Sequence, residues 1–143
     1  MDNQTLSLII SNRLTQVNWD SFSDTDWDSL VAKAHAAGVA PLLYWTFSKA
    51  GRLSSLPQAA RNFLRVSYAG TWMRNQKIFE ELEILARLFS QADIPVVVLK
   101  GACFALTIYP DIGLRPMGDL DLLVPKDKLA EALDNAKTQL SDA

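Results

Sequence analysis

The chain has 143 residues, of which 49% are hydrophobic and 21% are charged. This composition is typical of a globular protein and excludes wholesale disorder. The net charge of −2 comes without any run of Lys or Arg, which disfavours nucleic acid as a partner, and the single cysteine, Cys103, excludes an intrachain disulfide.

Helical periodicity dominates residues 1–93. Near the N-terminus, apolar side chains recur at helical spacing, at Leu6, Ile9, Ile10 and Leu14. Thr25 and Asp28 resemble a capping box, which would open a helix at this point. Gly38 is expected to end that helix, because glycine readily adopts the left-handed conformation found at helix ends.

Proline and glycine divide the rest of this region into two further helices. Pro41 suits the first turn of a helix from Leu42 to Ala50, which Gly51 would terminate. Pro57 opens a longer helical region, within which Gly70 predicts a break or kink. Its second part carries apolar residues at steps of four, three and four, namely Ile78, Leu82, Leu85 and Phe89.

The pattern changes after Asp93. Residues 96–99 are β-branched and apolar on both faces, which predicts a buried strand, and a short helix is expected from Ala102 to Tyr109. A loop rich in turn residues then leads to a second strand at residues 119–124. Asp127 is suited to cap a final helix. The apolar face predicted for that helix comprises Leu129, Leu133, Ala136 and Leu140.

This order of elements predicts an α+β fold. We expect an N-terminal helical region (1–93) followed by a truncated βαβα core with a small mixed sheet (94–143). Because a sheet normally needs at least three strands for independent stability, the chain reads as part of a longer protein. An open strand edge would also favour pairing with another chain, so we expect self-association.

Asp119 and Asp121 form the constellation most suggestive of chemistry. Two residues apart on a strand, their carboxylates would share one face, with Cα atoms ~6–7 Å apart. Mg²⁺ is often held by one or two carboxylates together with substrate phosphates. Gly101 lies at a strand-to-helix turn, where free N–H groups can receive a phosphate. The alternative is that two exposed carboxylates on the wet face of a strand have no function.

The motifs taken together are more specific than either carboxylate. The segments that carry the pattern are 98–101, 109–111, 113–116 and 119–124. Over these segments the chain resembles the uncharacterised bacterial nucleotidyltransferase family of the DNA polymerase β-like superfamily. The resemblance implies that the turn at Gly101-Ala102 holds a nucleoside triphosphate, and that Asp119 and Asp121 bind Mg²⁺ in a two-metal site. An acceptor hydroxyl would then attack the α-phosphate and release pyrophosphate.

The chain departs from that family pattern in two respects. Ala102 has no hydroxyl, so a phosphate contact there must come from the backbone, and Lys100 would compensate as a point charge. The superfamily also places a third carboxylate on a later strand, which the acids after Asp121 do not supply. Arg115 has two open interpretations: it steadies Asp121 or a phosphate, or it pairs with Asp111 or Asp119 to shape the loop.

The sequence therefore leaves three functions open. The first is metal-dependent nucleotidyl transfer from a nucleoside triphosphate to an unidentified acceptor, completed by residues outside this chain. The others are a non-catalytic nucleotide- or metal-binding module and a helical interaction module. With no leader peptide and no apolar run near the ~20 residues of a membrane span, we expect a cytoplasmic protein without a membrane partner.

Overall fold

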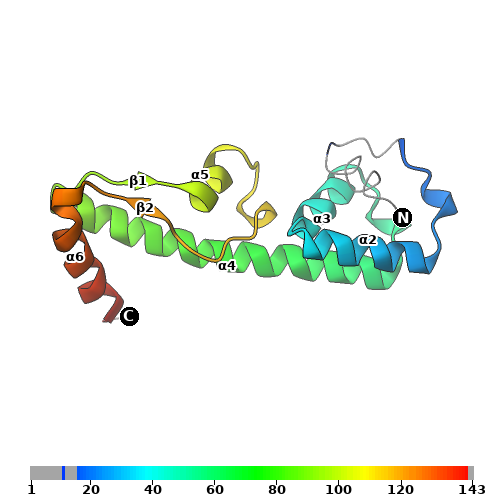
Figure 1. Cartoon of the computed structure of the whole chain (residues 1–143). Helices are drawn as coiled ribbons and strands as arrows, with labels where there is room; N and C mark the ends of the chain where they lie inside the picture. Colours follow the sequence, from blue (N-terminus) through cyan, green and yellow to red (C-terminus); the bar gives the residue numbers. More distant parts are fainter. Residues whose placement is uncertain (1–10, 12–15, 142–143) are drawn as a thin grey trace.

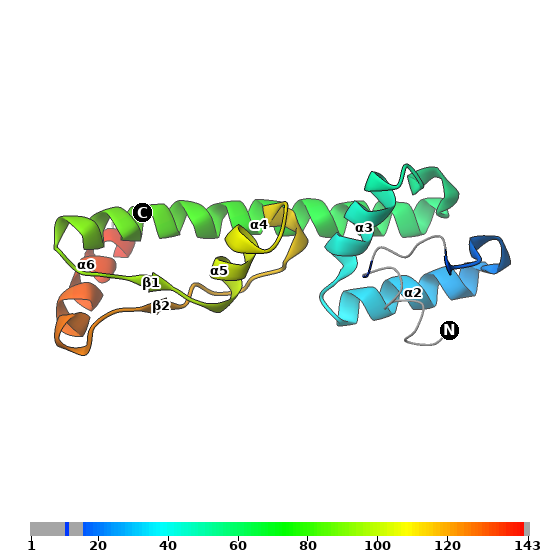
Figure 2. The same cartoon turned by 90° about the horizontal axis from the view of Figure 1, so that it is seen from above.

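The computed structural model of the chain describes residue 11 and residues 16–141, so the apolar stripe predicted between Leu6 and Leu14 lies outside the described residues. One long helix, α4 (Gln58–Gln91), runs along most of the molecule (Figure 1). Its 34 residues correspond to a length of about 50 Å. The N-terminal helices pack at one end of α4, and the strands and remaining helices lie along the other half (Figures 1 and 2).

The N-terminal half is built from two helices on α4. A 3-10 turn (η2, Trp19–Ser21) leads to α2 (Asp24–Ala36), which is followed by α3 (Ala40–Lys49) and a second 3-10 turn (η3, Leu53–Ser55). Gly38 and Gly51 have φ values of 69° and 67°, and these left-handed residues follow α2 and α3 as the sequence predicts. The capping box of α2 is Ser23 with Asp26, two residues before the predicted pair.

Helix α4 continues through Gly70 without interruption, so the predicted break is wrong. Gly70 is exposed and a side chain there would meet no other atom within 4 Å, which means that neither packing nor backbone strain acts on this position. The helix ends at Gln91, and Asp93 then adopts a φ of 53° at the predicted change of pattern. Both halves of the molecule are therefore carried on one helix.

The C-terminal half consists of a β-ribbon with helices at its two ends. Strand β1 (Val97–Val98) leads into α5 (Lys100–Thr107), and the chain returns through a 3-10 turn (η4, Ile112–Leu114) to β2 (Leu122–Leu123). The two strands are antiparallel, with Val97 opposite Leu123. The α+β class holds, but the sheet is not mixed, because α5 and η4 gather at one end of β1 and send the chain back along it (Figure 2).

The ribbon is buried on one face only. Val96 and Val98 of the β1 segment pack toward α4, as do Leu122 and Val124 of the β2 segment. Val97 and Leu123 are more than half exposed on the opposite face, at 55% and 56%. The expectation that residues 96–99 are buried on both faces is thus wrong, since no described element covers the outer face of the ribbon.

The last helix packs through a different face from the predicted one. A 3-10 turn (η5, Lys126–Lys128) containing Asp127 precedes α6 (Leu129–Ser141). Ala132 is the buried residue of α6 and joins Phe89 and Ile94 in one apolar cluster, whereas Leu129 and Leu133 are about half exposed. The side chain of Leu140 lies outside the described part.

The main core lies in the N-terminal half. Its largest buried side chains come from α2, α3 and the start of α4, and include Leu30, Leu43, Phe47 and Leu64. Smaller clusters lie between α4 and the ribbon. Within the residues that the structure describes, no helix combines the length and apolar character needed to cross a bilayer.

Candidate functional site

The junction of β1 and α5 has an unusual backbone. Lys100 adopts a φ of 47°, the left-handed region that side-chain-bearing residues rarely occupy. Such conformations persist only where the surrounding structure holds them in place, and they are found most often at ligand sites. Leu99 precedes α5 without capping it by a side chain, so the first N–H groups of α5 have no side-chain cap.

The alternation of the β2 segment places the two candidate carboxylates. Leu120 packs on the cluster formed by Ala102, Ala105 and Met117, and Leu122 packs on the cluster of Phe89. Because successive side chains of extended backbone point to opposite faces, the residues between and before them point outward. Asp119 and Asp121 accordingly belong to the outer face. They precede the paired residues of β2 and are not inside the strand.

Asp121 lies directly against the β1–α5 junction. Its carbonyl accepts a hydrogen bond from the Leu99 amide at 3.0 Å, and its carboxylate Oδ2 lies 3.2 Å from the Lys100 ammonium. The Lys100 side chain is 72% exposed, so this ion pair contributes only ~0–1 kcal/mol. A ligand can therefore displace Lys100 from Asp121 at little cost. Asp119 is exposed and pairs with no described side chain.

Arg115, in the loop before β2, lies beside the same junction. Its guanidinium lies over the ring of Phe104, 5.6 Å from the centroid, and its Nε is buried without a hydrogen-bond partner in the described structure. A Cβ built on Gly101 would lie 3.9 Å from that Nε and 3.4 Å from the Met117 Cγ. These are ordinary contacts, so packing alone does not demand glycine at position 101.

A buried amide on α4 positions the loop that carries Arg115. Asn75 is fully buried, and its Nδ2 donates to the carbonyls of Ile112 at 2.5 Å and Arg115 at 2.7 Å. The sequence analysis missed this role, although a lone polar residue on the inner face of a long amphipathic helix is a usable signal. Asn75 thus holds the backbone of this loop at Ile112 and Arg115.

The start of the same loop is fixed by Asp111. Its carboxylate accepts a hydrogen bond from the Gly113 amide at 2.7 Å. Burial raises the pKa of Tyr68, and a hydrogen bond with the Asp111 carboxylate raises it further. Arg115 forms no ion pair with Asp111 or Asp119 among the described residues. Asp111 instead accepts a hydrogen bond from the Gly113 amide, and the Arg115 guanidinium lies over the Phe104 ring.

The arrangement thus brings positive and negative groups together at the corner where β1, α5 and the segment before β2 meet. Lys100, Arg115 and the N-terminus of α5 favour an anion, while Asp119 and Asp121 favour a cation. Ala102 is buried, so only its backbone can contribute, as expected. Among the described residues, no group of three or more His, Cys, Asp or Glu side chains is placed to hold a metal ion.

The chain matches the sequence model of a known protein family. The sequence model of a family described as "Uncharacterised nucleotidyltransferase" matches residues 23–138, which is most of the chain. No curated protein and no solved structure gives a significant match.

Proposed function

Because the chain belongs to the uncharacterised nucleotidyltransferase family, we propose that the corner between β1, α5 and β2 binds a nucleoside triphosphate together with Mg²⁺ for nucleotidyl transfer. The observation that carries the proposal is the meeting of Asp121, Lys100 and Gly101 at one uncapped helix N-terminus. Triphosphate and metal require opposite charges side by side, and this corner supplies both.

The phosphate half of the site would be made by the chain's cations and backbone. The N–H groups at Gly101 and Ala102 would donate to phosphate oxygens, with the α5 dipole adding to the attraction. Lys100 would leave its exposed pairing with Asp121 and move to the phosphates as a point charge. Arg115, whose Nε would lie 3.9 Å from a Cβ built on Gly101, would add its positive charge to the same half of the site.

Asp119 and Asp121 would hold the metal. They share the outer face of the β2 segment, and carboxylate oxygens are the ligands that Mg²⁺ prefers, with phosphate oxygens and waters filling the other positions. Bound Mg²⁺ would supply charge stabilisation for the α-phosphate and for the pyrophosphate that leaves it. The side chains themselves would position the reactants and would form no covalent intermediate.

Calorimetry with each of the four Mg-nucleoside triphosphates tests the binding step. We expect saturable, Mg²⁺-dependent binding by at least one of them. The double variant Asp119→Asn plus Asp121→Asn should bind about tenfold more weakly or worse, because its metal ligands lose their charge. Asp134→Asn, an exposed acid on α6, is the matched control and should bind as the wild type does. Absence of heat with all four nucleotides, or equal affinity in the double variant, would reject the proposal.

A non-catalytic nucleotide-binding module is the second candidate. The observation that favours it is the lack of a third acidic or histidine ligand near Asp119 and Asp121 within the described residues. Binding without pyrophosphate release, in the presence of a range of hydroxyl acceptors, would support this alternative. Release of pyrophosphate that depends on Asp119 and Asp121 would instead support transfer.

A further inference from the structure

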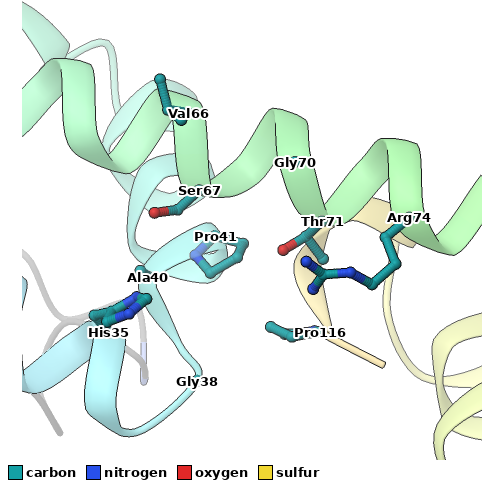
Figure 3. A pocket seen from close by; sticks show the side chains of 10 residues that line it. All are labelled: His35, Gly38, Ala40, Pro41, Val66, Ser67, Gly70, Thr71, Arg74 and Pro116. Atoms are coloured by element: carbon teal, nitrogen blue, oxygen red, sulfur yellow. The ribbon is translucent and has the colours of Figure 1, made fainter. Parts of the chain in front are cut away.

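A second hollow lies between the two halves of the molecule, outside the corner at β1. Its volume is about 310 Å³, which is at the lower end of the ~300–1,000 Å³ typical of ligand pockets. Figure 3 shows its walls: the α2–α3 turn at Gly38, the first turn of α3 at Pro41, one face of α4, and Pro116 from the loop before β2. The polar side chains that line it are those of His35, Ser67, Thr71 and Arg74.

Thr71 has a hydroxyl that makes no hydrogen bond with any described residue. The residue as a whole is only 6% exposed. Thr46, Thr107 and Thr138 instead donate to the carbonyl four residues earlier in their helices. In Figure 3 the Thr71 hydroxyl is directed toward the space beside Pro41. This hydroxyl is therefore available to hydrogen-bond a ligand in the pocket.

Arg74 makes the pocket electropositive. Its guanidinium extends from α4 toward the space between Thr71 and Pro116 (Figure 3), and it forms no ion pair with any described carboxylate. None of the ten described lining residues is acidic. A pocket lined by one cation and no carboxylate among the described residues favours anions.

The start of α3 adds a third favourable group. Ala40 and Pro41 of its first turn form part of the wall, and no side chain caps the helix at Val39. The positive end of the α3 dipole and the uncapped N–H of Ala40 therefore adjoin the same space as Thr71 and Arg74, whereas Pro41 has no N–H to donate. Donors thus approach from α3 on one side and from α4 on the other.

We propose that this pocket binds a small phosphomonoester. A tetrahedral phosphate accepts hydrogen bonds from several directions at once, which suits donors on two helices, and an arginine recognises it through paired N–H groups. Pro41, Val66 and Pro116 form an apolar part of the lining, which leaves room for an organic group beyond the phosphate. The proposal uses none of the residues at the β1–α5 corner and stands independently of nucleotide binding.

Amide proton–nitrogen correlation spectra of the isotope-labelled full chain would test it site by site. The probes are inorganic phosphate and phenyl phosphate, added at constant ionic strength without Mg²⁺ or nucleotide. We expect saturable shifts at the amides of Gly38 and Gly70, which line the pocket, and none at Gly51. The amide of Gly101 reports separately on the β1–α5 corner, so phosphate bound there is distinguished from phosphate in the pocket.

Two variants and a control complete the test. Arg74→Gln should weaken phosphate binding at Gly38 and Gly70 about tenfold, because a charge-assisted contact is lost. Thr71→Val removes the hydroxyl while keeping the shape, and should weaken binding without lowering the melting temperature. Arg65→Gln is the control, since nine positions at ~100° each place Arg65 on the opposite side of α4.

Three results would overturn the proposal. The first is a linear, non-saturating response at Gly38 and Gly70, and the second is an unchanged response in the variant carrying both Arg74→Gln and Thr71→Val. The third is equally tight binding of acetate, which would assign the pocket to carboxylates and not to phosphomonoesters.

Discussion

Asn75 shows how one buried side chain determines the shape of the proposed site. Asn75 is fully buried, and its amide group bridges two carbonyls of the loop that carries Arg115. The loop has little regular structure of its own beyond η4. Its conformation therefore depends on α4, about forty residues earlier in the chain.

We predict that Asn75→Ala destabilises the protein by about 2–4 kcal/mol, because two carbonyls lose their donor and a small cavity forms. Chemical denaturation would measure the change. Gln76→Ala is the control, since the Gln76 amide bonds only Glu80 on the exposed side of α4, and its loss should cost less than about 0.5 kcal/mol. Similar effects of the two substitutions would contradict the role given to Asn75. Where Asn75→Ala still folds, it should also bind Mg-nucleotide more weakly.

The raised pKa of Tyr68 predicts that the stability of the protein falls at alkaline pH. Its pKa is raised above the ordinary value of 10.0, first by burial and then by Asp111. The unfolded chain therefore loses this proton at a lower pH than the folded chain does. The resulting stability is fully present below pH 10.0 and is lost as the pH rises through the folded-state pKa. Denaturation across this range should show a shallower alkaline decline for Tyr68→Phe, and an identical decline would refute the assignment.

At the scale of elements, the packing of η4 on α4 leaves no room for a side chain at Gly113. A Cβ there would lie 2.8 Å from Tyr68 Cε2 and 3.1 Å from Trp72 Cβ. We predict that Gly113→Ala displaces the loop and costs about 1–3 kcal/mol. Gly118→Ala, in the same stretch of chain, would meet no atom within 4 Å and should change stability by less than about 0.5 kcal/mol. Thermal unfolding of both variants provides the comparison, and equal melting temperatures would disprove the close packing.

The helices could be predicted from local signals, because short sequence motifs mark their ends. Gly38, Gly51 and Pro57 marked boundaries that the structure retains within one or two residues. The capping box lies two residues before the predicted one. Ser23 and Thr25 both have an Asp three residues later, and the local sequence does not show which of the two pairs caps the helix. Gly70 weakens α4 by only ~1 kcal/mol relative to Ala, which the surrounding packing of a long helix can outweigh.

The face of α6 could not be predicted, because tertiary packing reverses the local ranking of residues. Hydrophobicity favours Leu129 and Leu133 as the buried positions, yet Ala132 is the residue in contact with Phe89. A small side chain lets two helix backbones approach closely, and this preference depends on the partner. In the same way, the sequence indicated Asp119 and Asp121 as a pair, whereas the contact of Lys100 with Asp121 depends on the antiparallel ribbon.

At the scale of the whole molecule, the open ribbon presents exposed apolar side chains in the C-terminal half. Both strands have one edge unpaired within the described residues, and the outer face presents Val97 and Leu123 opposite each other. An edge with exposed apolar side chains is a template for pairing with another strand. We therefore predict that the expected self-association takes place through this ribbon.

We predict that the protein associates reversibly with increasing concentration, and that Leu123→Lys weakens this association about tenfold. A charge on the outer face of an edge strand must be desolvated when a second chain pairs there, whereas it stays hydrated in the monomer. Met73→Lys is the control, because Met73 is similarly exposed, at 62%, on α4. Sedimentation at several concentrations would separate the two variants, and denaturation would establish that both fold. Association unchanged by Leu123→Lys but abolished by Met73→Lys would move the interface from the ribbon to α4.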